Sequence, residues 1–244
     1  MSPILSKINR WAARHTAQTT LPDLQQSIIS FSFDDCPKSA ITHGLPLLEA
    51  KGWRATIYVA YGLCGTTNHL GLHMSEDDIV ETYERGHEIA NHTYSHLSAH
   101  EVSLEAYLQD IDANRTALKA LGLPTSQHFA YPFGHATPRV KKALQEKFQT
   151  LRGVISPKSP SQDASLLNAV RVYSNNSIDL ALNEIAKAKT TPTWLHLFSH
   201  DVRDTPSKYG CTEADLEKVA SAVDASGLPV MTVDKAYRRI MDEA

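Results

Sequence analysis

Two histidines, His92 and His96, lie four positions apart in the sequence. If residues 91–96 form a helical turn, the two side chains share one face, with Cβ atoms about 5–6 Å apart, close enough to bind one metal ion. The chain contains 12 histidines, so such a pair also arises by chance, as two surface or helix-cap side chains. The spacing alone leaves both interpretations open.

A pair of aspartates, Asp34 and Asp35, follows the apolar, β-rich run at residues 28–33. This pattern predicts a strand that ends in a loop at the two carboxylates. Reactive groups of α/β barrels and open α/β sheets gather at the carboxyl ends of strands, where the loops meet at one mouth. One carboxylate and two imidazoles give three metal ligands and leave a position for water, as hydrolytic metals require. The alternative is that the aspartates only form a turn and cap the next helix.

The rest of the chain alternates between strand and helix patterns, which predicts parallel βα units and most simply a distorted (β/α) barrel of seven or eight strands. Strands are expected at residues 28–33, 54–61, 87–90, 128–131, 150–154, 169–173, 193–199 and 228–232. Helices are expected at residues 40–51, 75–85, 103–121, 178–188, 212–226 and from Pro138 onward, with Ser75 and Ser103 as N-caps and residues 156–162 as a loop.

Length and composition fit one α/β domain, because 244 residues are enough to bury a full core and no repeat or linker is visible. Residues 1–26, with weak helical periodicity and Pro22, are expected to form a lead-in arm. The three cysteines, Cys36, Cys64 and Cys211, form no C-x-x-C pair and are expected to be free thiols.

The formal net charge of -3 and the lack of a basic cluster give no footprint for nucleic acid or an anionic membrane surface. No apolar segment approaches the roughly 18 residues of a membrane span, and the first 24 residues lack the apolar centre of a secretory signal. We therefore expect a cytoplasmic protein, unless a leader was removed. The pattern does not define an oligomeric state.

Four short motifs stand in a characteristic order: Ser-Phe-Asp-Asp-Cys-Pro at 32–37, His-Thr-Tyr-Ser-His at 92–96, Ala-Tyr-Pro-Phe-Gly at 130–134 and Leu-Phe-Ser-His-Asp at 197–201. In order and separation they resemble the polysaccharide deacetylase family (NodB homology, carbohydrate esterase family 4) over about residues 27–240. The resemblance implies a catalytic domain at residues 27–244 with a distorted (β/α) barrel. It also implies removal of acetyl groups from N-acetylated sugars with a divalent metal.

Carried over by position, the resemblance makes Asp35, His92 and His96 the metal ligands, Asp34 the general base and His200 the general acid. The chemistry needs these types, because an amide carbonyl must be polarised and attacked by activated water, and its nitrogen must be protonated before the C–N bond breaks. Two imidazoles and one carboxylate suit Zn²⁺ best, and Co²⁺, Ni²⁺, Mn²⁺ and Fe²⁺ also accept them.

The resemblance further implies that the backbone N–H of Phe133 stabilises the oxyanion. Tyr131, Phe133 and Phe198 are the expected substrate contacts. Phe198 stands where the family usually has a leucine that lines the acetyl methyl pocket, so a reshaped pocket is expected here.

The chain departs from the family pattern at several positions. Ala130 replaces an arginine that pairs with the catalytic aspartate, and Arg152 either supplies the guanidinium from the next strand or is an ordinary surface residue. The Asp-Trp motif is missing, although Asp163 lies in the corresponding loop, and the group that orients His200 is unassigned. Cys36 replaces a glycine and is expected to be a packed thiol, with metal contact as the alternative. The histidines without matching motif positions are expected to be structural: His43, His69, His73, His87, His100, His128, His135 and His196.

The sequence thus predicts a metal-dependent N-deacetylase whose substrate is an N-acetylated oligo- or polysaccharide, chitin-like or an exopolysaccharide. One alternative is a hydrolase of a non-sugar amide or cyclic ureide, because the same barrel and metal set can act on other C–N bonds and the altered third and fourth motifs weaken the sugar assignment. The other is a catalytically silent carbohydrate-binding protein. The joint presence of base, acid and three metal ligands argues against the silent protein, which has no need of them.

Overall fold

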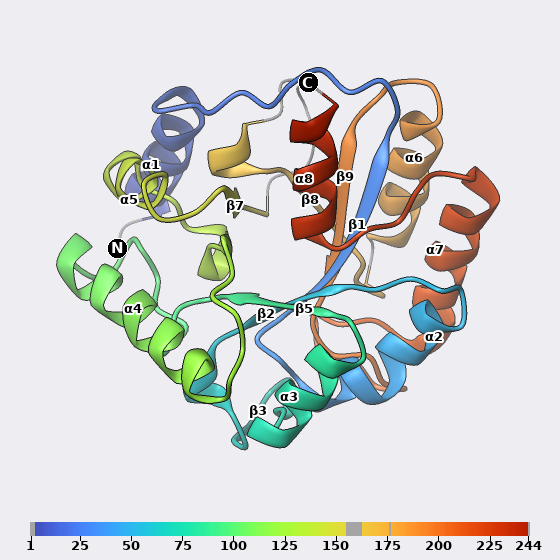
Figure 1. Ribbon diagram of the computed structural model, residues 1–244, viewed down its shortest axis with the longest axis horizontal. Helices are drawn as coiled ribbons and strands as arrows, with labels where there is room; N and C mark the ends of the chain where they lie inside the picture. The colour runs from blue at the N-terminus through green and yellow to red at the C-terminus, as the bar shows by residue number, and fades with distance from the viewer. Residues whose placement is uncertain (1–2, 155–162, 176, 244) are drawn as a thin grey trace.

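The computed structural model describes residues 3–154, 163–175 and 177–243; the predicted loop at 156–162 lies outside this part of the chain. Seven parallel strands form one sheet in the order β7-β6-β5-β2-β1-β9-β8 (Figure 1). Their bounds are β1 Ile28–Asp34, β2 Thr56–Val59, β5 Glu88–Asn91, β6 His128–Ala130, β7 Thr150–Arg152, β8 Ala169–Arg171 and β9 Trp194–Ser199. A small hairpin of β3 (Thr67–Asn68) and β4 (Gly71–Leu72) stands apart from the sheet.

The two edge strands of the sheet, β7 and β8, approach each other through the segment that leads into β8. Leu167 forms a parallel bridge with Arg152. The Gly153 N–H donates to the carbonyl of Leu167 at 2.8 Å, and the Leu167 N–H donates to that of Leu151 at 2.8 Å. The sheet is therefore a nearly closed barrel in a single domain, which confirms the predicted fold class with seven strands.

Helices surround the barrel, with α4 and α5 on one side of it and α6 and α7 on the opposite side (Figure 1). As predicted, Ser75 and Ser103 are N-caps, each accepting a first-turn N–H. No helix in the described residues is long and apolar enough to cross a membrane. The bounds are α1 Pro3–His15, α2 Leu45–Glu49, α3 Glu76–Glu84, α4 Leu104–Ala120, α5 Pro138–Leu144, α6 Ile178–Ala188, α7 Glu213–Ser226 and α8 Val233–Asp242.

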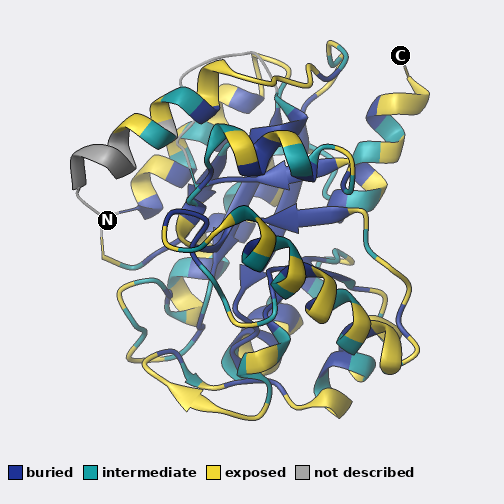
Figure 2. Cartoon of the chain, turned by 90° about the vertical axis from the view of Figure 1, so that its left-hand side faces the viewer, coloured by how far each residue is buried: buried dark blue, intermediate teal, exposed yellow. Residues whose placement is uncertain are grey.

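Every residue of β1 is buried, as is usual for a central strand of a parallel sheet covered by helices. Its side chains nevertheless alternate in character. Ile29, Phe31 and Phe33 face outward and join the main apolar cluster beneath the helices. Ser30 and Ser32, at the alternating positions, point into the barrel. Figure 2 shows the buried strands enclosed by helices whose outer faces are exposed.

The predicted eighth strand at 228–232 is wrong. Val230 makes only an isolated bridge to Ile29, although Pro229 and Met231 also bond to the backbone of Ile29. The segment fits there because β2 begins to pair with β1 only at Ser32, which leaves the start of β1 open on one side.

Helix α8, which the sequence analysis did not assign, closes the amino-terminal end of the barrel. Its first N–H groups donate to side chains at the starts of two strands: that of Val233 to Thr56 Oγ1 and that of Asp234 to Glu88 Oε2, both at 2.9 Å. Its apolar face packs against Ile28 and other barrel residues. Among the described residues, α8 thus covers this end of the barrel, and the cavity described below lies at the opposite, carboxyl-terminal end.

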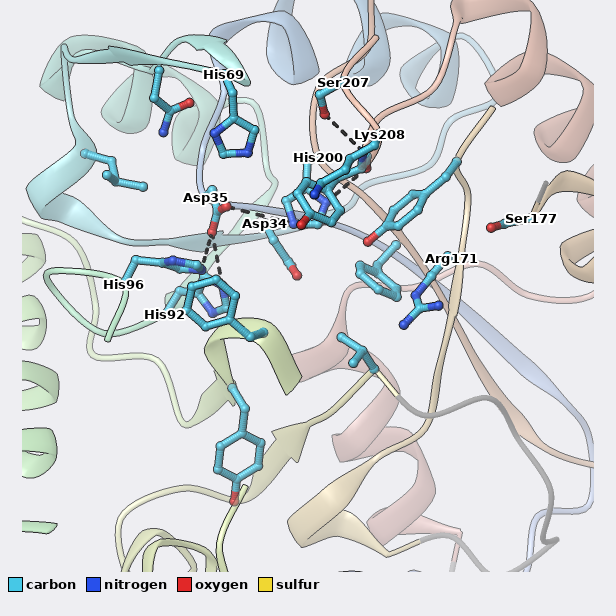
Figure 3. A pocket seen from close by; sticks show the side chains of 18 of the residues that line it. Asp34, Asp35, His69, His92, His96, Arg171, Ser177, His200, Ser207 and Lys208 are labelled. Atoms are coloured by element: carbon cyan, nitrogen blue, oxygen red, sulfur yellow. Dashed lines mark hydrogen bonds and ion pairs between the residues drawn. The ribbon is translucent and has the colours of Figure 1, made fainter. Parts of the chain in front are cut away.

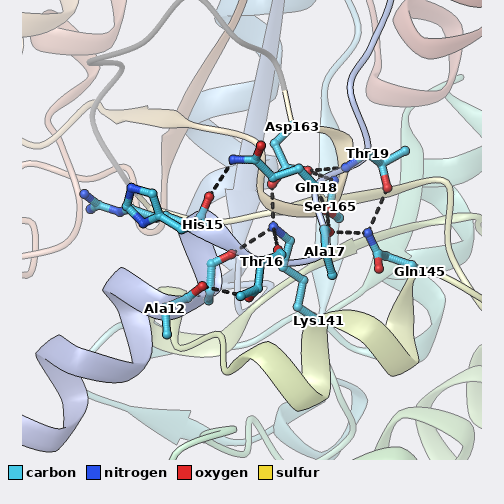
Figure 4. A network of polar contacts seen from close by, with 12 residues as sticks. Ala12, His15, Thr16, Ala17, Gln18, Thr19, Lys141, Gln145, Asp163 and Ser165 are labelled. Carbon is cyan, nitrogen blue, oxygen red and sulfur yellow. Dashed lines mark hydrogen bonds and ion pairs between the residues drawn. The ribbon is translucent and has the colours of Figure 1, made fainter.

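The predicted lead-in arm contains α1, which packs against α5. A buried lysine on α5, Lys141, fixes this contact by donating to the carbonyls of Ala13 at 2.8 Å and Thr16 at 2.9 Å (Figure 4). Its third partner is the carboxylate of Asp163 at 2.5 Å. Asp163 therefore helps Lys141 to hold the lead-in arm against α5.

Candidate active site

A cavity of about 1080 Å³ lies at the carboxyl-terminal mouth of the barrel, where the predicted reactive groups meet. Asp34, Asp35, His92, His96 and His200 all line it (Figure 3). Asp34 is the last residue of β1, and the two candidate ligand histidines, His92 and His96, follow β5. The structure therefore brings together, from distant parts of the chain, the residues that the sequence motifs singled out.

Asp35, His92 and His96 each offer one ligand atom, and these atoms lie within 4.8 Å of one another. Asp35 Oδ1 is 3.2 Å from His92 Nε2 and 3.0 Å from His96 Nε2. Asp35 Oδ1 is buried, yet it has no hydrogen-bond partner in the described part of the chain, since neither contact has hydrogen-bond geometry. The three atoms thus lie close enough together to bind one ion, and Asp, His and His are a suitable donor set for a divalent metal.

His92 is held in the tautomer that metal binding requires. Its Nδ1 lies 2.8 Å from the backbone carbonyl of Ala130, and because a carbonyl only accepts, Nδ1 carries the proton. The lone pair of the neutral ring is then on Nε2, which faces Asp35. Such a backbone partner commonly fixes the orientation of a metal-binding histidine.

Charge interactions within this cluster are mutual. Burial opposes ionisation of Asp35, but its contacts with His92 and His96 hold the pKa of the carboxyl well below its usual range. Burial also opposes protonation of His96, yet the nearby carboxylate of Asp35 raises the pKa of that imidazole.

The two ligand histidines do not lie on a helical turn, so that expectation was wrong. They occupy an irregular loop in which Thr93 and His96 have φ values of 61° and 53°. The carboxylate of Asp110 accepts the N–H groups of Tyr94 and Ser95, each at 2.9 Å. Side-chain acceptors thus replace the helical hydrogen bonds of this segment.

Arg152 lies against Asp34, so the surface alternative for this arginine is wrong. Its Nη2 is 2.6 Å and 2.5 Å from the two carboxylate oxygens, and both side chains are buried. The guanidinium is sandwiched between the rings of Tyr58 and Phe198, at 4.9 Å and 4.6 Å. Arg152 is the direct cross-strand partner of Ala130. The guanidinium thus comes from β7, one strand away from Ala130 on β6, the position where the family pattern has its arginine.

His200 is oriented by a backbone group. Its Nδ1 lies 3.1 Å from the carbonyl of Tyr209, which leaves Nε2 directed toward the cavity, 3.9 Å from Asp35 Oδ2. The rings of Tyr173 and Tyr209 flank it at 5.8 Å and 5.7 Å. Asp163 does not orient His200, because its carboxylate is paired with Lys141.

The three expected substrate contacts differ in their exposure. Phe133 has φ 59°, is 54% exposed and packs edge-on against His96 at 4.5 Å, so its ring is open to a ligand. Phe198 is buried beneath the cavity against Tyr173. Tyr131 contributes to the lining, but its side chain is 1% exposed and its hydroxyl donates to the Ser165 carbonyl at 3.4 Å. Its ring is thus a structural support.

Sequence reasoning missed several residues of the cavity wall. His69, expected to be structural, lines the cavity and contacts the ring of Tyr209 edge-on. Arg171 and Lys208 also line it. None belongs to a recognisable motif. The sequence alone does not indicate that loop residues so far apart along the chain line one cavity. Cys36 is buried outside the ligand cluster, which agrees with a packed thiol.

The nearly closed parallel barrel, with Asp, His and His at its carboxyl mouth, is a (β/α) barrel with a candidate metal centre. The family model for polysaccharide deacetylase matches residues 22–149, just over half of the chain, and the protein belongs to this family. The matched segment includes the aspartate pair and both ligand histidines; Arg152 and His200 lie beyond it.

Among solved structures, the chain is similar to the chitin deacetylase of the fungal pathogen Colletotrichum lindemuthianum, with 16% identity, a TM-score of 0.64 and coverage of 89% of this chain and 90% of that one. It is also similar to the peptidoglycan deacetylase PdaC of Bacillus subtilis, with 15% identity, a TM-score of 0.62 and coverage of 90% and 93%. A third is the Xyl-CE4 domain of a multidomain xylanase from the hindgut metagenome of Trinervitermes trinervoides. It has 18% identity, a TM-score of 0.61 and coverage of 88% of this chain and 91% of that one. These similarities show a shared fold over nearly the whole length. No curated protein sequence matches the chain.

Proposed function

We propose that this protein is a metal-dependent hydrolase that removes N-acetyl groups from an N-acetylated oligo- or polysaccharide. The observation that carries the proposal is the convergence of three metal-ligand atoms with the Asp34–Arg152 pair and His200 around one cavity. Membership of the polysaccharide deacetylase family supports it, as do the chitin and peptidoglycan deacetylases with the same fold.

Asp35, His92 and His96 would hold the divalent cation, for which Zn²⁺ is the expected choice. When bound, such a cation polarises the amide carbonyl and lowers the pKa of water. The ligands meet at the mouth of the barrel, so the cation would remain open to substrate on the cavity side.

Asp34 and His200 divide the proton transfers. Asp34 takes a proton from the attacking water, while Arg152 balances its charge and fixes its position through the contact to both oxygens. His200, with Nδ1 held by the Tyr209 carbonyl, donates the proton of Nε2 to the amide nitrogen as the C–N bond breaks. The products are acetate and the free amino sugar.

The backbone N–H of Phe133 stabilises the oxyanion. The positive φ of this residue turns the chain sharply after Pro132 at the cavity edge. In the described residues this N–H has no backbone partner, whereas those of Gly134 and His135 are both bonded. It is thus available to a substrate oxygen.

The test combines metal analysis with a screen for acetate release. Purified protein is freed of metal, reloaded with each candidate cation and assayed on chito-oligosaccharides, N-acetylated exopolysaccharide fragments, simple amides and cyclic ureides. We expect one bound cation and metal-dependent acetate release from the saccharides. Turnover of only amides or ureides would replace the substrate assignment, and binding of saccharides without any turnover would identify a silent carbohydrate-binding protein.

Two variants separate the roles of the adjacent aspartates. Asp34→Asn keeps the shape but cannot accept a proton, so bound metal should remain while turnover is lost. Asp35→Asn should weaken metal binding first, because a neutral amide is a poorer ligand for a hard or borderline cation. An equal loss of metal in both variants would contradict this division.

A further inference from the structure

We propose that the saccharide taken by this site carries an anionic group, a carboxylate or a phosphate, that Arg171 and Lys208 bind. The inference rests on the proposed function and adds a substrate class to it. Both residues line the cavity of the candidate active site. Figure 3 shows their side chains on the side where His200 lies, away from His92 and His96.

The two cations come from separate elements that converge at this end of the cavity. Arg171 is the last residue of β8 and is the cross-strand partner of Phe198. Lys208 lies in the loop after β9, with Nζ 4.8 Å from the centre of the Tyr209 ring. The backbone of this loop is fixed, because Asn175 donates to the Lys208 carbonyl at 3.0 Å and the Tyr209 carbonyl accepts from His200. Lys208 is therefore placed beside the imidazole that would protonate the leaving amine.

Neither cation forms an ion pair with a carboxylate in the described part of the chain, unlike other cations near the barrel mouth. Arg152 is paired with Asp34, and Arg203, in the same loop as Lys208, is paired with Asp201 at 2.8 Å. The carboxylates of the cavity are also engaged: Asp34 by Arg152 and Asp35 by the histidine pair. This end of the cavity thus holds positive charge that the protein itself does not neutralise.

The positive end is not a consequence of the overall composition, since the formal net charge of the chain is -3. Ser177, the residue before α6, also lines the cavity, so the amino end of this helix adds the positive end of its dipole. Charge of one sign in a cleft with low-dielectric walls focuses the field on an incoming ligand. A neutral saccharide makes no use of such a field, whereas an acidic one is both attracted and oriented by it.

The cavity is large enough for this arrangement. Its volume of about 1080 Å³ slightly exceeds the usual range for ligand pockets, so a sugar placed at the metal ligands leaves room for a substituent or a second sugar toward Arg171. Hydrogen bonds to charged groups contribute enough to change an affinity about 10-fold or more each. We therefore expect an acidic N-acetylated sugar to bind at least about 10-fold more tightly than its neutral counterpart.

The experiment compares three probes on metal-loaded protein by calorimetry: N-acetylglucosamine, N-acetylmuramic acid with its carboxylate, and N-acetylglucosamine 6-phosphate. Arg171→Gln and Lys208→Gln should each reduce the ratio between acidic and neutral affinities by about 5-fold or more. Lys142→Gln is the matched control, because it removes an exposed cation on α5 outside the cavity and should leave the ratio unchanged. The acidic probe with the larger ratio identifies carboxylate or phosphate as the anion.

Equal affinity for all three probes would overturn the inference, as would a preference for anions that survives both substitutions. Failure of both acidic probes to bind at millimolar concentration would also overturn it. A separate assay of acetate release keeps the two proposals distinguishable. Absence of release from every N-acetylated saccharide contradicts the proposed function, whereas release without preference for acidic substrates contradicts only the anion site.

Discussion

The two faces of the barrel strands differ sharply in chemistry. On the outer face, β1 and β9 present Phe31, Phe33 and Leu197 to the helices, and these side chains belong to one apolar cluster. On the inner face, at alternating positions, β1 presents Ser30 and β9 presents His196, both buried. Strand alternation lets one segment serve both surroundings.

The inner face is polar through several layers. Its buried polar residues include Ser30, Ser32, Thr56, His128, Thr150, Arg152 and His196. Some of their atoms lack a hydrogen-bond partner among the described residues, including the Nε of Arg152 and both ring nitrogens of His196. Buried polar groups of this kind cost stability. We infer that the outer face supplies the stability of the fold, while the inner face is used to hold the charged groups beneath the site.

The largest effect should follow from removing a proposed metal ligand at the mouth of the barrel. His92→Ala deletes the nitrogen that faces Asp35, so bound metal should fall and kcat/KM should drop by about 10³-fold or more, equivalent to several kcal/mol of lost carbonyl polarisation. Metal content by atomic emission and the circular dichroism spectrum check this together. A variant with full metal content would contradict the ligand assignment.

Breaking the buried ion pair between Asp34 and Arg152 should have the next largest effect, and this effect should be on the stability of the fold. Arg152→Met leaves the carboxylate of Asp34 buried and unpaired, which should lower the free energy of unfolding by about 3–5 kcal/mol. The double variant Arg152→Met with Asp34→Asn removes both charges and should recover much of this loss. Denaturant titrations of the two single variants and the double variant measure the coupling, and simple additivity would show that the pair does not act as a unit.

An outer-face substitution should change stability without changing the site. Leu197→Ala deletes a fully buried side chain from the main cluster and should cost about 2–5 kcal/mol. At 25 °C, where the variant remains folded, its kcat/KM should stay within about 3-fold of the parent, because the side chain points away from the cavity. A large fall in activity of folded protein would blur the division between the two faces.

Much of the fold followed from sequence because alternation and caps are local signals. The end of β1 at Asp34 and the caps Ser75 and Ser103 lie where the pattern placed them. Features set by tertiary contacts did not follow. The segment at 228–232 has strand-like composition, but β1 offers it only the short free edge at Ile29.

The site shows the same division between local and distant information. Motif positions led to the aspartates, the histidines and, as one of two alternatives, to Arg152 beside Asp34. The group that orients His200 is a backbone carbonyl, which any residue at position 209 would offer, so the sequence has no means of marking it. Arg171 and Lys208 line the same cavity because β8 ends beside the loop that follows β9.

The smallest predicted effect concerns the pH dependence of the inner face. His196 is buried, and its burial, together with the charge of nearby Arg152, lowers the pKa of the imidazole to about 3. In the unfolded chain the ring titrates near its usual value of about 6.5. Between these two pH values the unfolded state therefore binds the extra proton, and stability falls as the pH drops.

From pH 7 down to 4.5 this single residue should remove about 2.5 kcal/mol from the free energy of unfolding. His196→Gln keeps a polar, neutral side chain at the position and should lose that much less stability over the same acidification, whatever its stability at pH 7. Urea titrations of parent and variant at pH 7 and 4.5 give the difference, and other histidines with lowered pKa values, such as His87, cancel in it. Equal losses of unfolding free energy in the two proteins would contradict this prediction. They would show that His196 accepts its proton inside the folded barrel, and that the inner face tolerates a second positive charge near Arg152.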